Sequence, residues 1–319
     1  MHASLRAFLS GVVDYAGLFP PAKLPLDDSI RNYARYRTGP DAWMLGRFIC
    51  PAARLGELMP YLPELFADGP PLAVSALGRG GNTLREFLEG LRDDLEALLA
   101  FRAKCEGRAV VDVLELKLPG ELLRHDREKE LGAAVHGPAE LLARAGGAPA
   151  LFCEIPFEPG WGVRLAFLLR ALAQDPGRGK GFKFRCGGLE ASAFPPPGDV
   201  ALALTACRQE RVPLKFTAGL HHPVRHFDRG VRAMMHGFLN VFGAGVLAFA
   251  HGLDRDRLLP LLEDEDAADF VFDEAGFRWQ GLRATTAQIE AARRQLVLSF
   301  GSCSFDEPRD DLRALGLLR

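Results

Sequence analysis

Segments typical of buried β-strands alternate with segments typical of helices along most of this 319-residue chain. The strand-like segments are short and apolar on both faces, as a parallel sheet covered by helices requires. Residues 83–105 form the clearest helical pattern, because Leu84, Phe87 and Leu91 recur at a helical period. About eight such β-then-α units in about 250 residues predict an α/β fold, a (β/α)8 TIM barrel. The predicted strands are residues 12–19, 43–50, 72–77, 110–118, 150–156, 182–186, 214–218 and 238–242.

The barrel is predicted to occupy residues 1–262, followed by a short C-terminal hairpin-helix extension over residues 263–319. In the extension, residues 270–279 have the pattern of a hairpin, and residues 285–298 that of a helix. Residues 299–308 are rich in small side chains and are predicted to be a loop. An open, doubly wound sheet is the alternative architecture, but no GxGxxG motif follows the first strand.

Composition excludes several classes of protein. The chain is 48% apolar and 25% charged, which predicts a full core rather than disorder. Its formal net charge of −2 gives no reason to expect a nucleic-acid partner. The longest apolar run, residues 239–250, is too short to span a membrane. Six cysteines without a CxxC pair indicate reduced thiols in a cytoplasmic protein. A homo-oligomer is possible, since barrels often pair.

Charged side chains lie near the carboxyl ends of four consecutive predicted strands, where barrels build their reaction sites. They are Glu115 and Lys117, then Glu154, then Lys183 and Arg185, and then Lys215. Because side chains alternate along a strand, Lys183 and Arg185 share one face, as do Glu115 and Lys117. The pattern favours a polar pocket over the alternative, a purely structural network of ion pairs.

Lys183 and Lys215 are the residues from which we expect chemistry. A lysine beside another cation in a dry pocket has a lowered pKa and becomes a nucleophilic amine, able to form a Schiff base with a carbonyl compound. Arg185 lies two residues from Lys183, and Lys215 lies on the next predicted strand. The alternative is that both lysines hold a carboxylate or phosphate as fixed charges.

These two segments resemble class I aldolases of the deoxyribose-phosphate aldolase type. That family carries its Schiff-base lysine on strand six in a K-x-S/T-x-G motif, and a tuning lysine on strand seven in K-x-S/T-G-G-I/L. Lys215-Phe-Thr-Ala-Gly-Leu220 matches the second motif with alanine at one glycine position. Lys183-Phe-Arg-Cys-Gly187 matches the first in lysine and glycine only, with Arg185 in place of the hydroxyl residue. The family also uses an aspartate on strand four, for which Asp112 is the nearest counterpart. The resemblance spans predicted strands four to seven.

Several loop residues complete the predicted site. His221 and His222 follow the seventh strand, where they could act as general acid and base or, with Glu115 and Glu154, bind a divalent metal. Glycines after strands seven and eight could present backbone amides to a phosphate, although close helix packing explains them equally well. These glycines are Gly219, Gly243 and Gly245. Asp14, in the first loop, could contact substrate; the alternative is that Gly17, Pro20 and Pro21 make this loop a simple turn.

The sequence therefore predicts a carbon–carbon lyase that acts through a Schiff base on a small anionic carbonyl compound, without a cofactor or metal. Lys183 would be the nucleophile, Lys215 its activating neighbour and Arg185 a substrate anchor, while Glu115 or Glu154 moves protons. A metal-dependent isomerase or hydrolase and a non-catalytic binder of an anionic metabolite are the alternatives. Cys303, in a Gly/Ser-rich segment, is either an ordinary tail thiol or a thiol presented at the barrel mouth.

Overall fold

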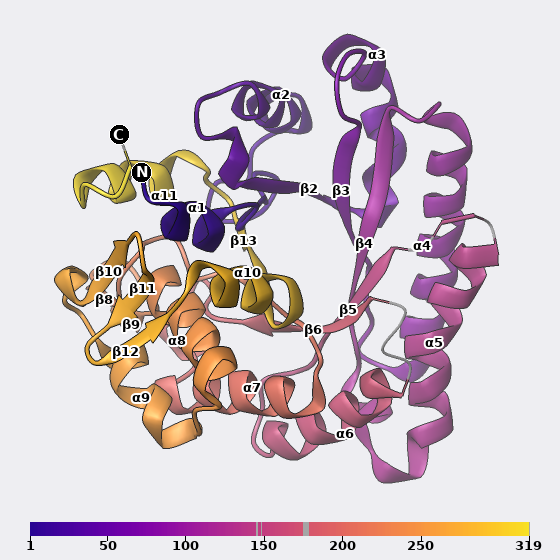
Figure 1. Ribbon diagram of the computed structural model, residues 1–319. Coiled ribbons are helices and arrows are strands. Elements are labelled where there is room, and N and C mark those ends of the chain that lie inside the picture. The colour runs from indigo at the N-terminus through magenta and orange to yellow at the C-terminus, as the bar shows by residue number, and fades with distance from the viewer. Residues whose placement is uncertain (145, 148, 175–178, 319) are drawn as a thin grey trace. The chain divides into compact units, whose positions relative to one another are not determined.

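Eight parallel strands form a closed barrel in the order β1, β2, β3, β4, β5, β6, β7 and β13 (Figure 1). The computed structural model describes residues 1–144, 146–147, 149–174 and 179–318. The predicted (β/α)8 TIM barrel is therefore confirmed. The barrel strands are β1 (Val13–Tyr15), β2 (Leu45–Pro51), β3 (Leu72–Leu77), β4 (Ala109–Lys117), β5 (Ala150–Glu154), β6 (Lys180–Arg185), β7 (Leu214–Thr217) and β13 (Val297–Ser302).

Two compact units make up the chain. Unit 1 contains Met1–Lys23, Gly39–Gly46 and the described part of Phe184–Arg319, and unit 2 contains Leu24–Thr38 and Arg47–Lys183. Within the described residues, no helix is long and apolar enough to cross a membrane.

In unit 2, helix α4 (Leu84–Lys104) packs on β4 and helix α5 (Glu128–Arg144) packs on β5. The longest helix of this unit, α4, begins with a capping box in which Thr83 and Glu86 satisfy each other's backbone amides. Phe87, Leu91 and Leu98 then turn the apolar stripe of α4 inward, as their spacing predicts. The helices of this unit are α2 (Leu26–Arg37), α3 (Leu62–Leu65), α4 (Leu84–Lys104), α5 (Glu128–Arg144) and α6 (Trp161–Ala173), with 3₁₀ turns over Ala52–Tyr61, Gly120–Leu123 and His125–Arg127.

Unit 1 combines barrel strands with two small antiparallel sheets. The predicted hairpin is present as β10 (Phe270–Asp273) and β11 (Gly276–Trp279), to which β12 (Leu282–Ala284) adds a third strand. A second hairpin joins β8 (His226–Asp228) and β9 (Ala233–Met235). The helices of unit 1 are α1 (Ala3–Leu9), α7 (Pro197–Glu210), α8 (Phe238–His251), α9 (Arg255–Glu263), α10 (Thr286–Gln295) and α11 (Asp306–Ala314), with 3₁₀ turns over Ala42–Met44, Ala191–Ala193 and Ala267–Asp269.

The eighth barrel strand is not where the sequence predicts it. Residues 238–242 form the first turns of α8, and the eighth strand is β13, in a segment predicted to be the end of a helix followed by a loop. The error has a physical cause: α8 is buried from Phe238 to Ala248, and a helix that is apolar on every side cannot be told from a buried strand by periodicity. Barrel strands thus lie on both sides of residue 262.

Gly245 allows α8 to pack closely on β13. A β-carbon at this position would lie 2.4 Å from Val297 Cγ1. We expect Gly245→Ala to lower the free energy of unfolding by about 1–3 kcal/mol, because this contact leaves no space for a methyl group. Gly132→Ala in α5 is the matched control, since nothing lies within 4 Å of a β-carbon there. Urea unfolding of both variants measures the difference, and equal stabilities would contradict the packing argument.

Candidate active site

Lys183 lies between two carboxylates in unit 2. Its Nζ is 2.7 Å from Glu115 Oε2 and 3.0 Å from Glu154 Oε2. Ser75 on β3 donates its hydroxyl to Glu115 Oε1 at 2.6 Å. The Lys183, Glu115 and Glu154 side chains are 4%, 1% and 8% exposed, so the pairs are almost completely removed from water. We call these four residues the Lys183 cluster.

Strand register brings the Lys183 cluster together. Lys117 on β4 pairs with Glu154 on β5, and Cys153 on β5 pairs with Phe182 on β6. Glu154 and Lys183 each follow one of the paired residues Cys153 and Phe182, so they lie opposite each other on β5 and β6. Glu115 lies two residues before Lys117, the partner of Glu154, and therefore on the same face of the sheet. Glu154 is the last residue of β5, so the cluster lies toward the carboxyl ends of its strands. The sequence predicted this convergence, although it did not predict Ser75.

The pKa of Lys183 moves in the direction opposite to the predicted one. Burial lowers the pKa of the Lys183 ammonium, but its contacts with Glu115 and Glu154 outweigh burial, and the net pKa is raised. A neighbouring cation would lower this pKa, as predicted, but the two carboxylates at hydrogen-bonding distance have the larger effect. In the free protein, Lys183 is therefore an ammonium ion with two adjacent proton acceptors.

Lys215 belongs to a second buried cluster, which lies in unit 1. Its Nζ is 2.8 Å from Asp14 Oδ2, to which Ser299 donates its hydroxyl at 2.7 Å. The Lys215 side chain is 1% exposed and that of Asp14 is fully buried. At Gly46, a β-carbon would lie 2.3 Å from Asp14 Oδ1, so a glycine is required beside this carboxylate. Asp14, predicted as a substrate contact, is a partner of Lys215.

The two adjacent histidines point to different carboxylates on α11. His221 Nδ1 is 3.0 Å from Glu307 Oε2, and His222 Nδ1 is 2.6 Å from Asp311 Oδ2. In the part of the chain that the structure describes, no three His, Cys, Asp or Glu side chains are grouped so that they could hold a metal ion. The predicted metal alternative had required His221 or His222 to act with Glu115 and Glu154, which belong to the other unit.

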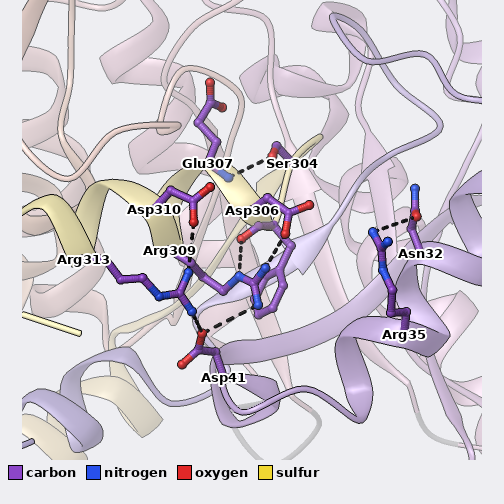
Figure 2. A network of polar contacts seen from close by, with 10 residues as sticks. Asn32, Arg35, Asp41, Ser304, Asp306, Glu307, Arg309, Asp310 and Arg313 are labelled. Carbon is purple, nitrogen blue, oxygen red and sulfur yellow. Dashed lines mark hydrogen bonds and ion pairs between the residues drawn. The ribbon is translucent and has the colours of Figure 1, made fainter. Parts of the chain in front are cut away.

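An ion-pair network in unit 1 fixes the helix that carries these carboxylates (Figure 2). Arg309 and Arg313 of α11 both contact the carboxylate of Asp41, Arg309 at 3.6 Å. The α11 backbone is also held at its start, where the Glu307 amide donates to Ser304 Oγ at 3.1 Å. Because the Asp41 side chain is only 9% exposed, these contacts are shielded from water, and α11 has a fixed position within unit 1.

His221 is expected to stabilise the protein more at about pH 6 than at about pH 10. Burial lowers its pKa, but contacts with Cys303 and Glu307 prevail and raise the pKa to about 9. Because this value exceeds the pKa of an unfolded histidine, the stabilisation is complete below about pH 6.5 and is lost as the pH rises through about 9. It amounts to at most about 3 kcal/mol. Urea unfolding of the wild type and His221→Gln measures it; a difference independent of pH would contradict this assignment.

The remaining predicted site residues lie outside the Lys183 cluster, some at exposed strand ends and others in structural contacts. Lys117 and Arg185 are the exposed last residues of β4 and β6, as expected for side chains at a barrel mouth. Gly219 has a φ of +70°, and a β-carbon there would lie 2.6 Å from the Cys186 carbonyl oxygen. A glycine at this position therefore allows its backbone to lie close to that of Cys186. Asp112, the counterpart of the family aspartate, forms an ion pair with Arg47 at 2.8 Å.

The predicted phosphate site at Gly243 and Gly245 is wrong. Both glycines lie inside α8, where backbone amides are engaged in helix hydrogen bonds, and not at a helix N-terminus. A β-carbon at Gly243 would lie 2.9 Å from the Phe277 ring, so helix packing accounts for this glycine as it does for Gly245.

No protein-family model matches the sequence, and no curated protein is significantly similar to it. Of the resemblance to deoxyribose-phosphate aldolases, the structure supports the barrel fold alone. Proteins with this fold are usually enzymes. A barrel fold does not determine the reaction, which depends on the residues of the site.

Proposed function

We propose that this protein is a carbon–carbon lyase that forms a Schiff base between Lys183 and a small anionic carbonyl compound. One observation carries the proposal: the buried Lys183 amine lies 2.7 and 3.0 Å from two carboxylates near the carboxyl ends of barrel strands. Buried charges are costly to maintain, and perturbed charge clusters of this kind are enriched at functional sites.

The two carboxylates supply the proton transfers that a Schiff base needs. Lys183 must first lose a proton, and Glu115 or Glu154 accepts it at hydrogen-bonding distance. The free amine then adds to the substrate carbonyl carbon, and the protonated carboxyl returns its proton so that the carbinolamine oxygen leaves as water. The resulting iminium ion accepts the electron pair of the adjacent carbon–carbon bond while a carboxylate removes the proton of the β-hydroxyl group. An aldehyde leaves, and protonation and hydrolysis of the enamine release the second product.

Exposed cations suit an anionic substrate. Lys117 and Arg185 end β4 and β6, the strands that carry Glu115 and Lys183. Arginine binds carboxylate and phosphate groups through a planar, two-point contact, which would orient a substrate above a reactive amine. Lys215, the predicted activating neighbour, is paired with Asp14 in unit 1 and has no part in this proposal.

Borohydride trapping tests the proposal. The full chain is incubated with a panel of small aldehydes and keto acids, reduced with borohydride, digested and mapped by mass spectrometry. We expect a reduced adduct on Lys183. Lys180, buried on the opposite face of β6 with its Nζ 2.5 Å from His136 Nδ1, is the internal control and is expected to remain unmodified. An unmodified Lys183 and Lys215 across the whole panel would exclude the Schiff-base mechanism.

A further inference from the structure

Cys303, His221 and Glu307 meet at the carboxyl ends of two paired strands. Cys303 directly follows β13, and His221 lies in the loop after β7. The register of these strands, with Gly301 paired to Thr217, brings both segments to one edge of unit 1. The Cys303 thiol is within hydrogen-bonding reach of the His221 ring, and His221 Nδ1 is 3.0 Å from Glu307 Oε2.

This arrangement has the parts of an activated nucleophile. A thiol lies against a base, and a third group orients that base. Glu307 can do so because the contacts of Arg309 and Arg313 with Asp41 hold α11 in place (Figure 2). His221 is 15% exposed, so solvent competes little for its ring nitrogens.

The other cysteines have different surroundings. Cys303 is 8% exposed, Cys105 is 4% exposed, and the remaining four are fully buried. Burial raises the pKa of the Cys50 and Cys153 thiols to about 12 and that of Cys186 and Cys207 still further. Cys303 differs from these cysteines in the group beside it, which is the imidazole ring of His221.

We propose that Cys303, His221 and Glu307 form a second reactive site, at which the Cys303 sulfur adds reversibly to the carbonyl carbon of a small aldehyde. A sulfur–carbon bond forms as the carbonyl π bond and the S–H bond break, and the thiol proton passes through the His221 ring to the aldehyde oxygen. The product is a hemithioacetal, and no further reactant is needed. Glu307 stabilises the imidazolium and orients it. The choice of an aldehyde rests on the proposed lyase function, because carbon–carbon cleavage releases one.

Two measurements on the full chain test this site. The first is alkylation by iodoacetamide at neutral pH, followed by peptide mapping. Cys303 is expected to react at least about tenfold faster than Cys105, and His221→Gln is expected to remove most of that advantage. The second is carbon-13 NMR with carbonyl-labelled acetaldehyde, in which a hemithioacetal resonance is expected for the wild type and absent from Cys303→Ser.

The outcomes separate this site from the lysine chemistry. Lys183→Met is expected to keep the hemithioacetal resonance while it loses the borohydride adduct, and Cys303→Ser is expected to do the reverse. A Cys303 rate no faster than that of Cys105, or one unchanged by His221→Gln in a variant with wild-type circular dichroism, would overturn the proposal. The proposal would also be overturned if the wild type gave no hemithioacetal resonance, or if the resonance were lost in Lys183→Arg, which keeps the positive charge between the carboxylates.

Discussion

Lys183→Met is expected to form no borohydride adduct and to lose turnover of the carbonyl substrate by about 10⁴-fold or more, because the nucleophile itself is removed. Mass mapping of trapped protein and turnover assays measure the two effects. Lys180→Met is the matched control: it removes a buried lysine from the same strand, but from the opposite face, and is expected to retain the adduct.

A second variant separates loss of chemistry from loss of folding. Lys183→Met leaves Glu115 and Glu154 without the cation between them, which destabilises the folded state. Lys183→Arg keeps a positive charge between the carboxylates but cannot form a Schiff base, so we expect a folded, inactive protein. Wild-type turnover in Lys183→Arg, or an adduct that survives in Lys183→Met, would show that another group reacts.

Asp14→Asn is expected to lower the free energy of unfolding by about 3–5 kcal/mol, because it removes the negative charge 2.8 Å from a Lys215 side chain that is 1% exposed. Urea unfolding measures the change. Addition of Lys215→Met to Asp14→Asn is expected to recover most of the loss, since the buried ammonium is then gone.

The ion pair between Arg47 and Asp112 provides the control for this prediction. Its side chains are 31% and 37% exposed, so Asp112→Asn is expected to cost no more than about 1 kcal/mol. Similar losses for Asp14→Asn and Asp112→Asn would show that burial does not decide the strength of the Lys215–Asp14 pair.

Local patterns sufficed for most of the barrel and part of the site. The third strand, residues 72–77, and the helix at residues 26–37 were predicted with the bounds that the structure has. Side-chain alternation was enough to place Glu115 with Lys117, and Lys183 with Arg185, on one face of each strand, because parity along a strand depends only on local geometry.

What sequence could not supply were partners far apart in the chain. Ser299 contacts Asp14 across 285 positions, and Glu307 contacts His221 across 86. The serine in Leu72–Leu77 was a usable signal, since a hydroxyl in a buried apolar strand needs a hydrogen-bond partner, and Ser75 finds one in Glu115. Strand β13 was missed for the same reason, since its partners β1 and β7 are also far away in the chain. Its small residues resemble a loop when they are considered without these two strands.

The position of β13 has a consequence for biosynthesis. This strand lies between β1 and β7, so β1 lacks this neighbour until residues 297–302 have been translated. Until then β1 and β7 each present an open row of backbone donors and acceptors, which is the kind of surface that promotes aggregation of nascent chains. Ring closure must therefore follow the translation of all seven other barrel strands, which precede β13 in the chain.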